Sequence, residues 1–193
     1  MYPNTQNEDY TAENYVADAL DYTGQQLLDI DACKEYNIYI SYEHPNLNDG
    51  ANYDFYSSWQ SYSKTSDQGC HLCVGGENIG GRAESPNDPG AWNRAQDAVV
   101  GWGGVEYYKS LAIQEVFHTY INDSNPTVQS MIPGTNEHDL GSTYSNNNAT
   151  PMAAGYPESQ QSGSCWSNNT ANNWTRLLNQ CERDGVKATS DSA

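Results

Sequence analysis

Basic side chains are scarce in this chain. Of its 193 residues, eight are Lys or Arg against 25 Asp or Glu, which gives a formal net charge of −17. A surface this acidic repels phosphate backbones and anionic lipid headgroups, so we expect neither nucleic-acid binding nor membrane binding. The charge suits an extracellular or high-salt environment, in which repulsion between acidic surfaces keeps a protein in solution.

Long apolar runs and phenylalanine are also scarce. No stretch of the sequence approaches the roughly 18–20 apolar residues of a membrane-spanning helix, which predicts a soluble protein. Hydrophobic residues make up 36% of the chain, and Tyr (15) far outnumbers Phe (2). The core must therefore be lean, with many aromatic rings that keep their hydroxyl groups in contact with water.

A secretory leader is missing from the start of the chain, because residues 1–9 have neither a basic segment nor an apolar one. The cysteines nevertheless favour an extracellular protein whose leader has been removed. Cys165 and Cys181 are the best candidates for a disulfide, which would pin the last helix to the loop before it. The pairing of Cys33, Cys70 and Cys73 stays open. Glycosylation sequons agree with secretion and begin at Asn122, Asn148, Asn168 and Asn173.

Apolar periodicity predicts four helices, over residues 12–31, 52–64, 105–122 and 170–185. Gly24 weakens the first of these and is expected to divide it in two. Stretches rich in β-forming residues predict strands over 36–42, 70–74 and 95–102. Residues 1–11 should fray, residues 75–90 form a long loop rich in Gly and Pro, and residues 123–168 show no periodicity.

This order of elements predicts an α+β fold. An α/β-like upper lobe would extend over about residues 12–122, and a loop-rich lower lobe with a C-terminal helix over about 123–193. The length fits a single domain, 1–193, that can bury a real core. We expect it to be a monomer.

The predicted helix at residues 110–121 carries the side chains that point to a chemistry. Gln114 and His118 are four residues apart and Glu115 and His118 are three apart, so all three are neighbours on a helix. Zinc peptidases use this layout when two histidines hold the metal and the glutamate between them is the general base. Here glutamine occupies the first histidine position. The alternative is a helix whose His118 simply hydrogen-bonds to a backbone carbonyl.

Two downstream features fit the same chemistry. His138 follows His118 by twenty positions, and Met152 lies in residues 150–156, Thr-Pro-Met-Ala-Ala-Gly-Tyr. With the helix, these features resemble the metzincin clan of zinc metallopeptidases, which have a helical His-Glu-x-x-His, a third histidine after the helix and a Met-turn beneath the metal. The resemblance covers about residues 12–185. It implies a mixed twisted sheet with flanking helices before the active-site helix, and a C-terminal helix after the turn.

The resemblance also implies roles for particular residues. Glu115 would be the general base, and His118 and His138 would be metal ligands. Met152 would be the methionine of the Met-turn, and Tyr156 lies near the place where some members have a tyrosine that contacts the metal or stabilises an oxyanion. The cofactor would be zinc, and the activity hydrolysis of a peptide or protein substrate by a metal-bound water.

The sequence departs from the pattern of the clan in its metal ligands. Gln114 replaces the first histidine, and an amide oxygen is a poorer zinc ligand than imidazole. Ile121 and Ser124 replace the glycine and the closely spaced third histidine, so a ligand at His138 needs an expanded connection. The candidates for a further ligand are Gln114, Asp139 and His71, although His71 can also be an ordinary strand histidine.

Three hypotheses therefore stay open. The chain is an active secreted metallopeptidase, a metzincin-like fold whose degenerate site serves binding or structure, or an unrelated secreted acidic binding or structural protein. Calcium is a second candidate ion because carboxylates and Asn-rich loops are abundant, although no Asp-x-Asp-x-Asp-Gly run is present. Cys70 and Cys73 could be a redox pair, but no thioredoxin-like context surrounds them, which favours a structural role.

Overall fold

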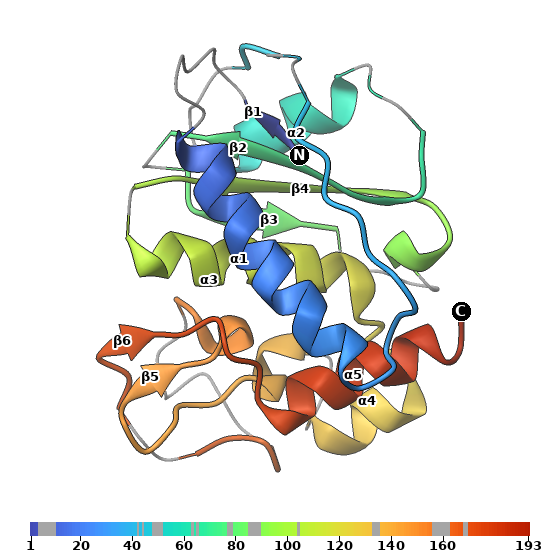
Figure 1. Ribbon diagram of the computed structural model, residues 1–193, viewed down its shortest axis with the longest axis vertical. Helices are drawn as coiled ribbons and strands as arrows, with labels where there is room; N and C mark the ends of the chain where they lie inside the picture. Colours follow the sequence, from blue (N-terminus) through green and yellow to red (C-terminus); the bar gives the residue numbers. More distant parts are fainter. Residues whose placement is uncertain are drawn as a thin grey trace.

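Figure 1 shows the computed structural model of the protein. It describes residues 1–3, 11–41, 43, 45–47, 52–62, 64, 66–76, 79–84, 90–103, 105–132, 136–155, 163–167 and 170–193. Helices and a small mixed sheet make up an α+β fold, which confirms the predicted fold class. The helices are α1 (Thr11–Leu28), α2 (Asn52–Ser61), α3 (Glu106–Tyr120), α4 (Pro126–Met131) and α5 (Gln180–Ser190).

The strands are β1 (Tyr2–Pro3), β2 (Gly69–Gly75), β3 (Gly81–Ala83), β4 (Ala95–Gly101), β5 (Asn148–Ala149) and β6 (Asn173–Trp174). The main sheet has the order β1-β2-β4-β3, and β1, β2 and β4 are parallel. β3 pairs antiparallel to β4 at the edge, with Gly81 opposite Val100. Residues 72–74 of β2 and 98–100 of β4 are apolar because helices cover both faces of the sheet there.

The two faces of the sheet pack against different helices (Figure 1). Leu72 and Val100 belong to the cluster that α1 and α3 complete, whereas Cys73 and Val99 belong to the cluster around α2. Since side chains alternate along a strand, His71 shares the α2 face with Cys73. The sheet therefore separates His71 from α3, and His71 is excluded as a further ligand for a site on that helix.

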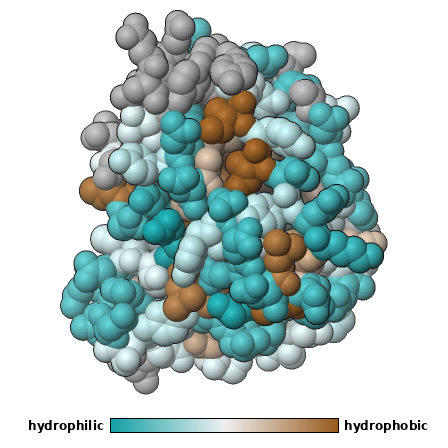
Figure 2. Space-filling view, viewed as in Figure 1, coloured by the Kyte–Doolittle hydropathy of each residue, from teal (hydrophilic) through white to brown (hydrophobic). Residues whose placement is uncertain are grey.

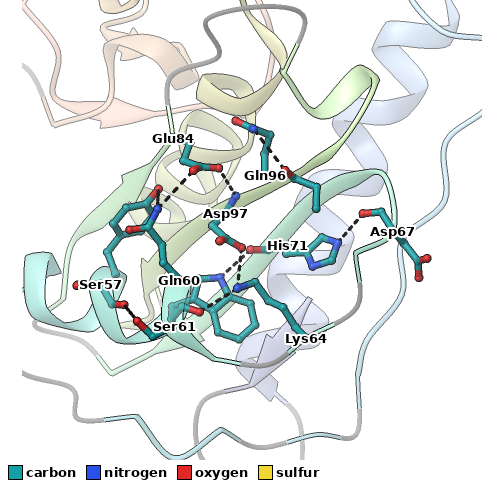
Figure 3. A network of polar contacts seen from close by, with 12 residues as sticks. Ser57, Gln60, Ser61, Lys64, Asp67, His71, Glu84, Gln96 and Asp97 are labelled. Atoms are coloured by element: carbon teal, nitrogen blue, oxygen red, sulfur yellow. Dashed lines mark hydrogen bonds and ion pairs between the residues drawn. The ribbon is translucent and has the colours of Figure 1, made fainter.

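The α2 face also carries a polar network (Figure 3). The ammonium group of Lys64 lies 3.1 Å from a carboxylate oxygen of Asp97 and donates to the Trp59 carbonyl at 2.9 Å. It also lies over the Trp59 ring, 4.4 Å from its centroid. His71 Nε2 meets the Asp67 carbonyl at 2.8 Å. These contacts fasten the segment after α2 to β2 and β4, which is a structural role.

α3 is the central helix of the molecule and is covered on both sides. Leu111 and Ala112 pack toward the sheet. Ile113 and Phe117 pack into a second core below, formed with the lower lobe. Its partners there come from the rest of the chain and include Val128, Ile132, Leu140, Met152, Leu178 and Val186. α3 is therefore buried on both sides, and the polar side chains that it buries have to find partners within the protein.

The first helix and the segment after it differ from the prediction. α1 continues through Gly24, where an added Cβ would lie 2.7 Å from the Tyr36 ring, so this glycine makes room for a packed side chain and does not break the helix. The predicted strand at 36–42 is wrong over the described residues 36–41. The Tyr36 hydroxyl donates to an Asp21 carboxylate oxygen at 2.7 Å, which holds the segment against α1. Residues 1–3 are not frayed, because β1 pairs with β2, and residues 4–10 of the predicted frayed segment lie outside the described residues.

The last predicted helix, 170–185, is wrong in its bounds. Trp174 lies in β6, and α5 begins only at Gln180. Asn179 caps α5 through its side chain and, with Glu182, forms a reciprocal capping box, which sets the start of the helix. The disulfide Cys165–Cys181 is present, and it ties the first turn of α5 to the preceding segment as predicted.

The middle of the lower lobe has more order than the sequence predicts. α4 begins after Asn125, whose side chain accepts from the backbone N–H of Thr127, with Pro126 in the first turn. The turns η2 (Glu137–Leu140) and η3 (Pro151–Ala153) follow. Short capped turns of this kind are too short to show the apolar periodicity, over about 11 residues or more, by which a helix is found from sequence.

The two ends of the chain are joined through Gln26 in α1. Its Oε1 accepts the Leu178 backbone N–H at 2.9 Å, and its Nε2 donates to the Arg176 carbonyl at 3.0 Å. Gln26 is buried, so its amide has exchanged water for these partners. Within the described residues, no helix is long and apolar enough to cross a membrane.

Cys70 and Cys73 do not form the redox pair considered above. Cys70 packs with the α1 and α3 cluster and Cys73 with the α2 cluster, so their side chains lie on opposite faces of β2. Burial raises the pKa of the Cys70 thiol to about 12, which keeps it protonated and unreactive.

Candidate active site

α3 places Gln114, Glu115 and His118 where the sheet meets the lower lobe. Gln114 and Glu115 are buried, with 1% and 5% of their surface exposed. Gln114 faces the turn η3, whereas Glu115 faces the edge strand β3. The helical spacing therefore brings the three predicted residues together, but in an environment that water hardly reaches.

Gln114 connects α3 to the Met152 turn. Its Nε2 donates to the carbonyls of Met152 at 3.2 Å and Ala154 at 3.0 Å, and it lies 3.2 Å from Nδ1 of His138. Carbonyl oxygens only accept, so the amide nitrogen must be the atom that faces this turn. At the position where the metzincin clan has its first histidine, this chain has a buried structural link.

His138 lies in η2 and meets the same turn. Its Nδ1 is 3.2 Å from the Met152 carbonyl. Burial, reinforced by the nearby charge of His118, lowers the pKa of His138 to about 3, so the imidazole is neutral near pH 7. A neutral imidazole that donates Nδ1–H to a carbonyl carries its lone pair on Nε2, the atom with which it can bind a metal.

His118 is paired with Glu137, a residue that the sequence reasoning did not select. His118 Nδ1 hydrogen-bonds to the Glu137 carboxylate, and both side chains are largely buried. Burial alone would lower the pKa of His118, but the hydrogen bond that His118 donates to Glu137 and the charges of Glu115 and Glu137 outweigh this effect, and the pKa is raised. Burial likewise raises the pKa of Glu137. The only feature of the sequence that pointed to Glu137 was its position directly before His138.

The two histidines lie side by side. Their ring centroids are 4.7 Å apart, and the ring planes are nearly perpendicular, at 84°. His118 comes from α3 and His138 from η2, so the turn that follows the helix returns to it. His118 and His138 are therefore neighbours although twenty positions of the chain separate them.

Glu115 lies against the backbone of β3. A Cβ added to Gly81 would be only 2.3 Å from Oε1 of Glu115, so the carboxylate occupies the space that a larger residue in the strand would fill. Burial raises the pKa of Glu115 to about 7, although the charges of His118 and Arg82 partly offset this. Glu115 can therefore exchange a proton close to neutral pH.

The question of a metal site turns on His118, His138 and the acids around them. In the ranges that the structure describes, no group of three or more His, Cys, Asp or Glu side chains is arranged to hold a metal ion. Asp139, the acid considered as a further ligand, is buried in η2 and completes no such group. His118 and His138 nevertheless have the contacts of ligands, because a carboxylate or carbonyl acceptor at Nδ1 is how proteins orient an imidazole that binds metal through Nε2.

The other predicted site residues have separate outcomes. Met152 is fully buried, and its carbonyl contacts Gln114 and His138. Tyr156 lies outside the described residues. Cys165 and Cys181 form their disulfide at the start of α5.

Comparison of the chain with protein-family models, with curated proteins and with solved structures finds no match in any of the three. The resemblance to metzincins therefore rests on the helix, on His138 and on the Met152 turn. Function has to be argued from the chemistry of these residues.

Proposed function

We propose that the protein is a secreted metal-dependent hydrolase that cleaves peptide bonds. One observation carries the proposal. Two neighbouring imidazoles, His118 and His138, are each anchored through Nδ1, and the buried carboxyl group of Glu115 lies one helical turn from His118. Anchored imidazoles beside an acid–base group are what a hydrolytic metal site requires.

His118 and His138 would hold the metal, with zinc the ion that best suits imidazole ligands. Bound there, zinc would polarise a substrate carbonyl and lower the pKa of water. Glu115 would accept a proton from water and return it to the leaving amine, a task for which a pKa of about 7 is well matched near neutral pH. Glu137 would keep the His118 ring oriented and balance its charge.

Secretion is part of the proposal. The acidic composition and the Cys165–Cys181 disulfide support it, because disulfides persist chiefly in oxidising compartments.

Gln114 favours a second candidate, a domain that binds metal or peptide without turnover. Its amide nitrogen is engaged by two carbonyls, so the first ligand position supplies a link to the turn and no imidazole. Two histidines alone make a weak zinc site, since zinc in proteins usually has at least three protein ligands.

The test is zinc binding together with cleavage of an unfolded protein. We expect about one zinc per chain, as in a single catalytic site, and cleavage that a chelator stops and zinc restores. Glu115→Gln should keep the zinc and lose about 10²- to 10⁴-fold in rate, the usual worth of a general base. Glu106→Gln, an exposed change on the same helix, is the matched control and should leave the rate unchanged.

Each other outcome of this test has a definite reading. Failure of the wild-type protein to take up zinc, or activity that survives Glu115→Gln, would overturn the hydrolase. Zinc binding without cleavage would favour the second candidate. In that case Gln114→His should tighten zinc binding, because it adds a third imidazole.

A further inference from the structure

A buried carboxylate on α5 contacts the turn beneath the candidate site. Glu182 is 0% exposed. Its Oε1 accepts the Met152 backbone N–H at 2.7 Å, and its Oε2 accepts the Asn179 backbone N–H at 2.8 Å. Both oxygens thus hold backbone groups of separate segments, one in η3 and one at the start of α5.

The contact continues from Met152 to the site. Glu182 takes the N–H of Met152, while the carbonyl of the same residue meets Gln114 Nε2 and His138 Nδ1, each at 3.2 Å. Met152 is fully buried and held at both its N–H and its C=O. The two groups belong to adjacent peptide units, so Glu182 fixes how the chain enters Met152, while the Ala153 N–H, which donates to the Thr150 carbonyl at 3.0 Å, helps to set the direction of the Met152 carbonyl. That direction decides whether His138 carries its proton on Nδ1.

A helix cap does not account for this arrangement. The glutamate of a capping box needs only to reach the N-cap N–H, and it does so at the surface as well as in the interior. Here burial raises the pKa of Glu182 to about 7, so the buried position opposes ionisation. The second oxygen, directed at Met152, is the feature that a cap does not require.

We propose that Glu182 is a positioning residue of the site: through the Met152 N–H, it holds the turn η3 in the conformation in which the Met152 carbonyl fixes His138 as the Nδ1–H tautomer. The metal-binding consequence rests on the proposed function, in which His138 Nε2 is a ligand. The tautomer itself does not depend on metal, so the two ideas can be tested apart.

The experiment measures the ¹⁵N shifts of the His138 ring in metal-free protein, and then the dissociation constant for zinc. Wild-type protein should show one tautomer with the proton on Nδ1. Glu182→Gln offers an amide N–H₂ to one of the two backbone donors, so the turn should shift and His138 should show mixed tautomers. Zinc should bind about 10- to 100-fold more weakly, the usual effect of losing an outer-shell partner.

Thr189→Val is the matched control. Thr189 is also fully buried on α5, and its hydroxyl accepts the Asn122 N–H at 2.9 Å and donates to the Gly185 carbonyl. Removing it should destabilise the same helix but leave the His138 tautomer and zinc binding unchanged. Should Glu182→Gln not fold, Glu182→Asp replaces it. This variant keeps the charge but is too short to reach both N–H groups, and the ¹⁵N shifts of its His138 ring test the inference in the same way.

If His138 keeps the wild-type tautomer in the Glu182 variant, and the variant only loses stability as Thr189→Val does, the inference is overturned and Glu182 is only a helix cap. Mixed tautomers in a protein that takes up no zinc would support the positioning role and refute the metal site.

Discussion

Glu115 shows how far a single residue can be understood from sequence. Its spacing from His118 predicts that the two are neighbours, and they are. The sequence does not reveal its burial against β3, which rests on Gly81, a glycine that lies in the long loop predicted at 75–90. A loop is recognised by its turn residues, and these hide a three-residue edge strand. The environment that sets the pKa of Glu115 therefore could not be predicted.

The pKa of Glu115 leads to a prediction about stability and pH. Its folded-state pKa is about 7 against an ordinary value of 4.5, so ionising it costs the folded protein stability as the pH rises from 4.5 toward 7. In metal-free protein, Glu115→Gln removes this cost. Relative to the wild type, the variant should gain on the order of 3 kcal/mol in unfolding free energy between pH 4.5 and pH 8.

Urea unfolding at several pH values measures this difference. Glu106→Gln, at the exposed start of the same helix, should show no such trend. A constant difference between Glu115→Gln and wild type across this range would mean that the Glu115 carboxyl group titrates like an exposed one.

At the scale of elements, patterns within one segment were predictable and contacts between segments were not. β2 and β4 were found from short apolar runs at residues 72–74 and 98–100, and α3 was found from its helical periodicity. The stripe of Trp174, Leu177, Leu178 and Cys181 has helical spacing, yet the capping box of Asn179 and Glu182 interrupts it and starts α5. At the site, Gln114 and His138 lie 3.2 Å apart and share the Met152 carbonyl, a backbone atom that no side-chain pattern marks.

The disulfide gives a prediction for α5. Cys165 and Cys181 are 16 residues apart, and closing a loop of about 15 residues restricts the unfolded chain by about 3 kcal/mol. Replacing both with serine should lower the unfolding free energy by roughly that amount, measured in urea without reductant. Cys33→Ser, a change at a half-buried thiol that forms no disulfide, should stay within about 0.5 kcal/mol of the wild type. Equal effects of the two changes would show that the bond does not stabilise α5.

The whole molecule is dominated by its charge. The face shown in Figure 2 is mainly hydrophilic, with hydrophobic residues in separate patches. A formal net charge of −17 on 193 residues makes the folded state repel itself. The lean core has to hold against this repulsion, which extends over about 10 Å at 0.1 M salt and about 3 Å at 1 M.

Salt should therefore stabilise the protein. We expect the urea midpoint at pH 7 to rise steadily as NaCl increases from 0.1 M to 1 M, because screening weakens the repulsion between carboxylates. Near the sequence isoelectric point of about 4.2, the same series should have little effect. A midpoint that rises equally at both pH values would point to general exclusion of salt from the surface, without a role for charge.

Gln26 has a consequence for the way this protein is made. Its partners, Arg176 and Leu178, are about 150 positions further along the chain. While a ribosome is still adding those residues, α1 has already emerged but lacks the groups that complete its buried amide. Domains commonly fold as units during synthesis; here the buried contacts of the first helix are completed by residues 176–178, so its native packing waits until those residues have been made.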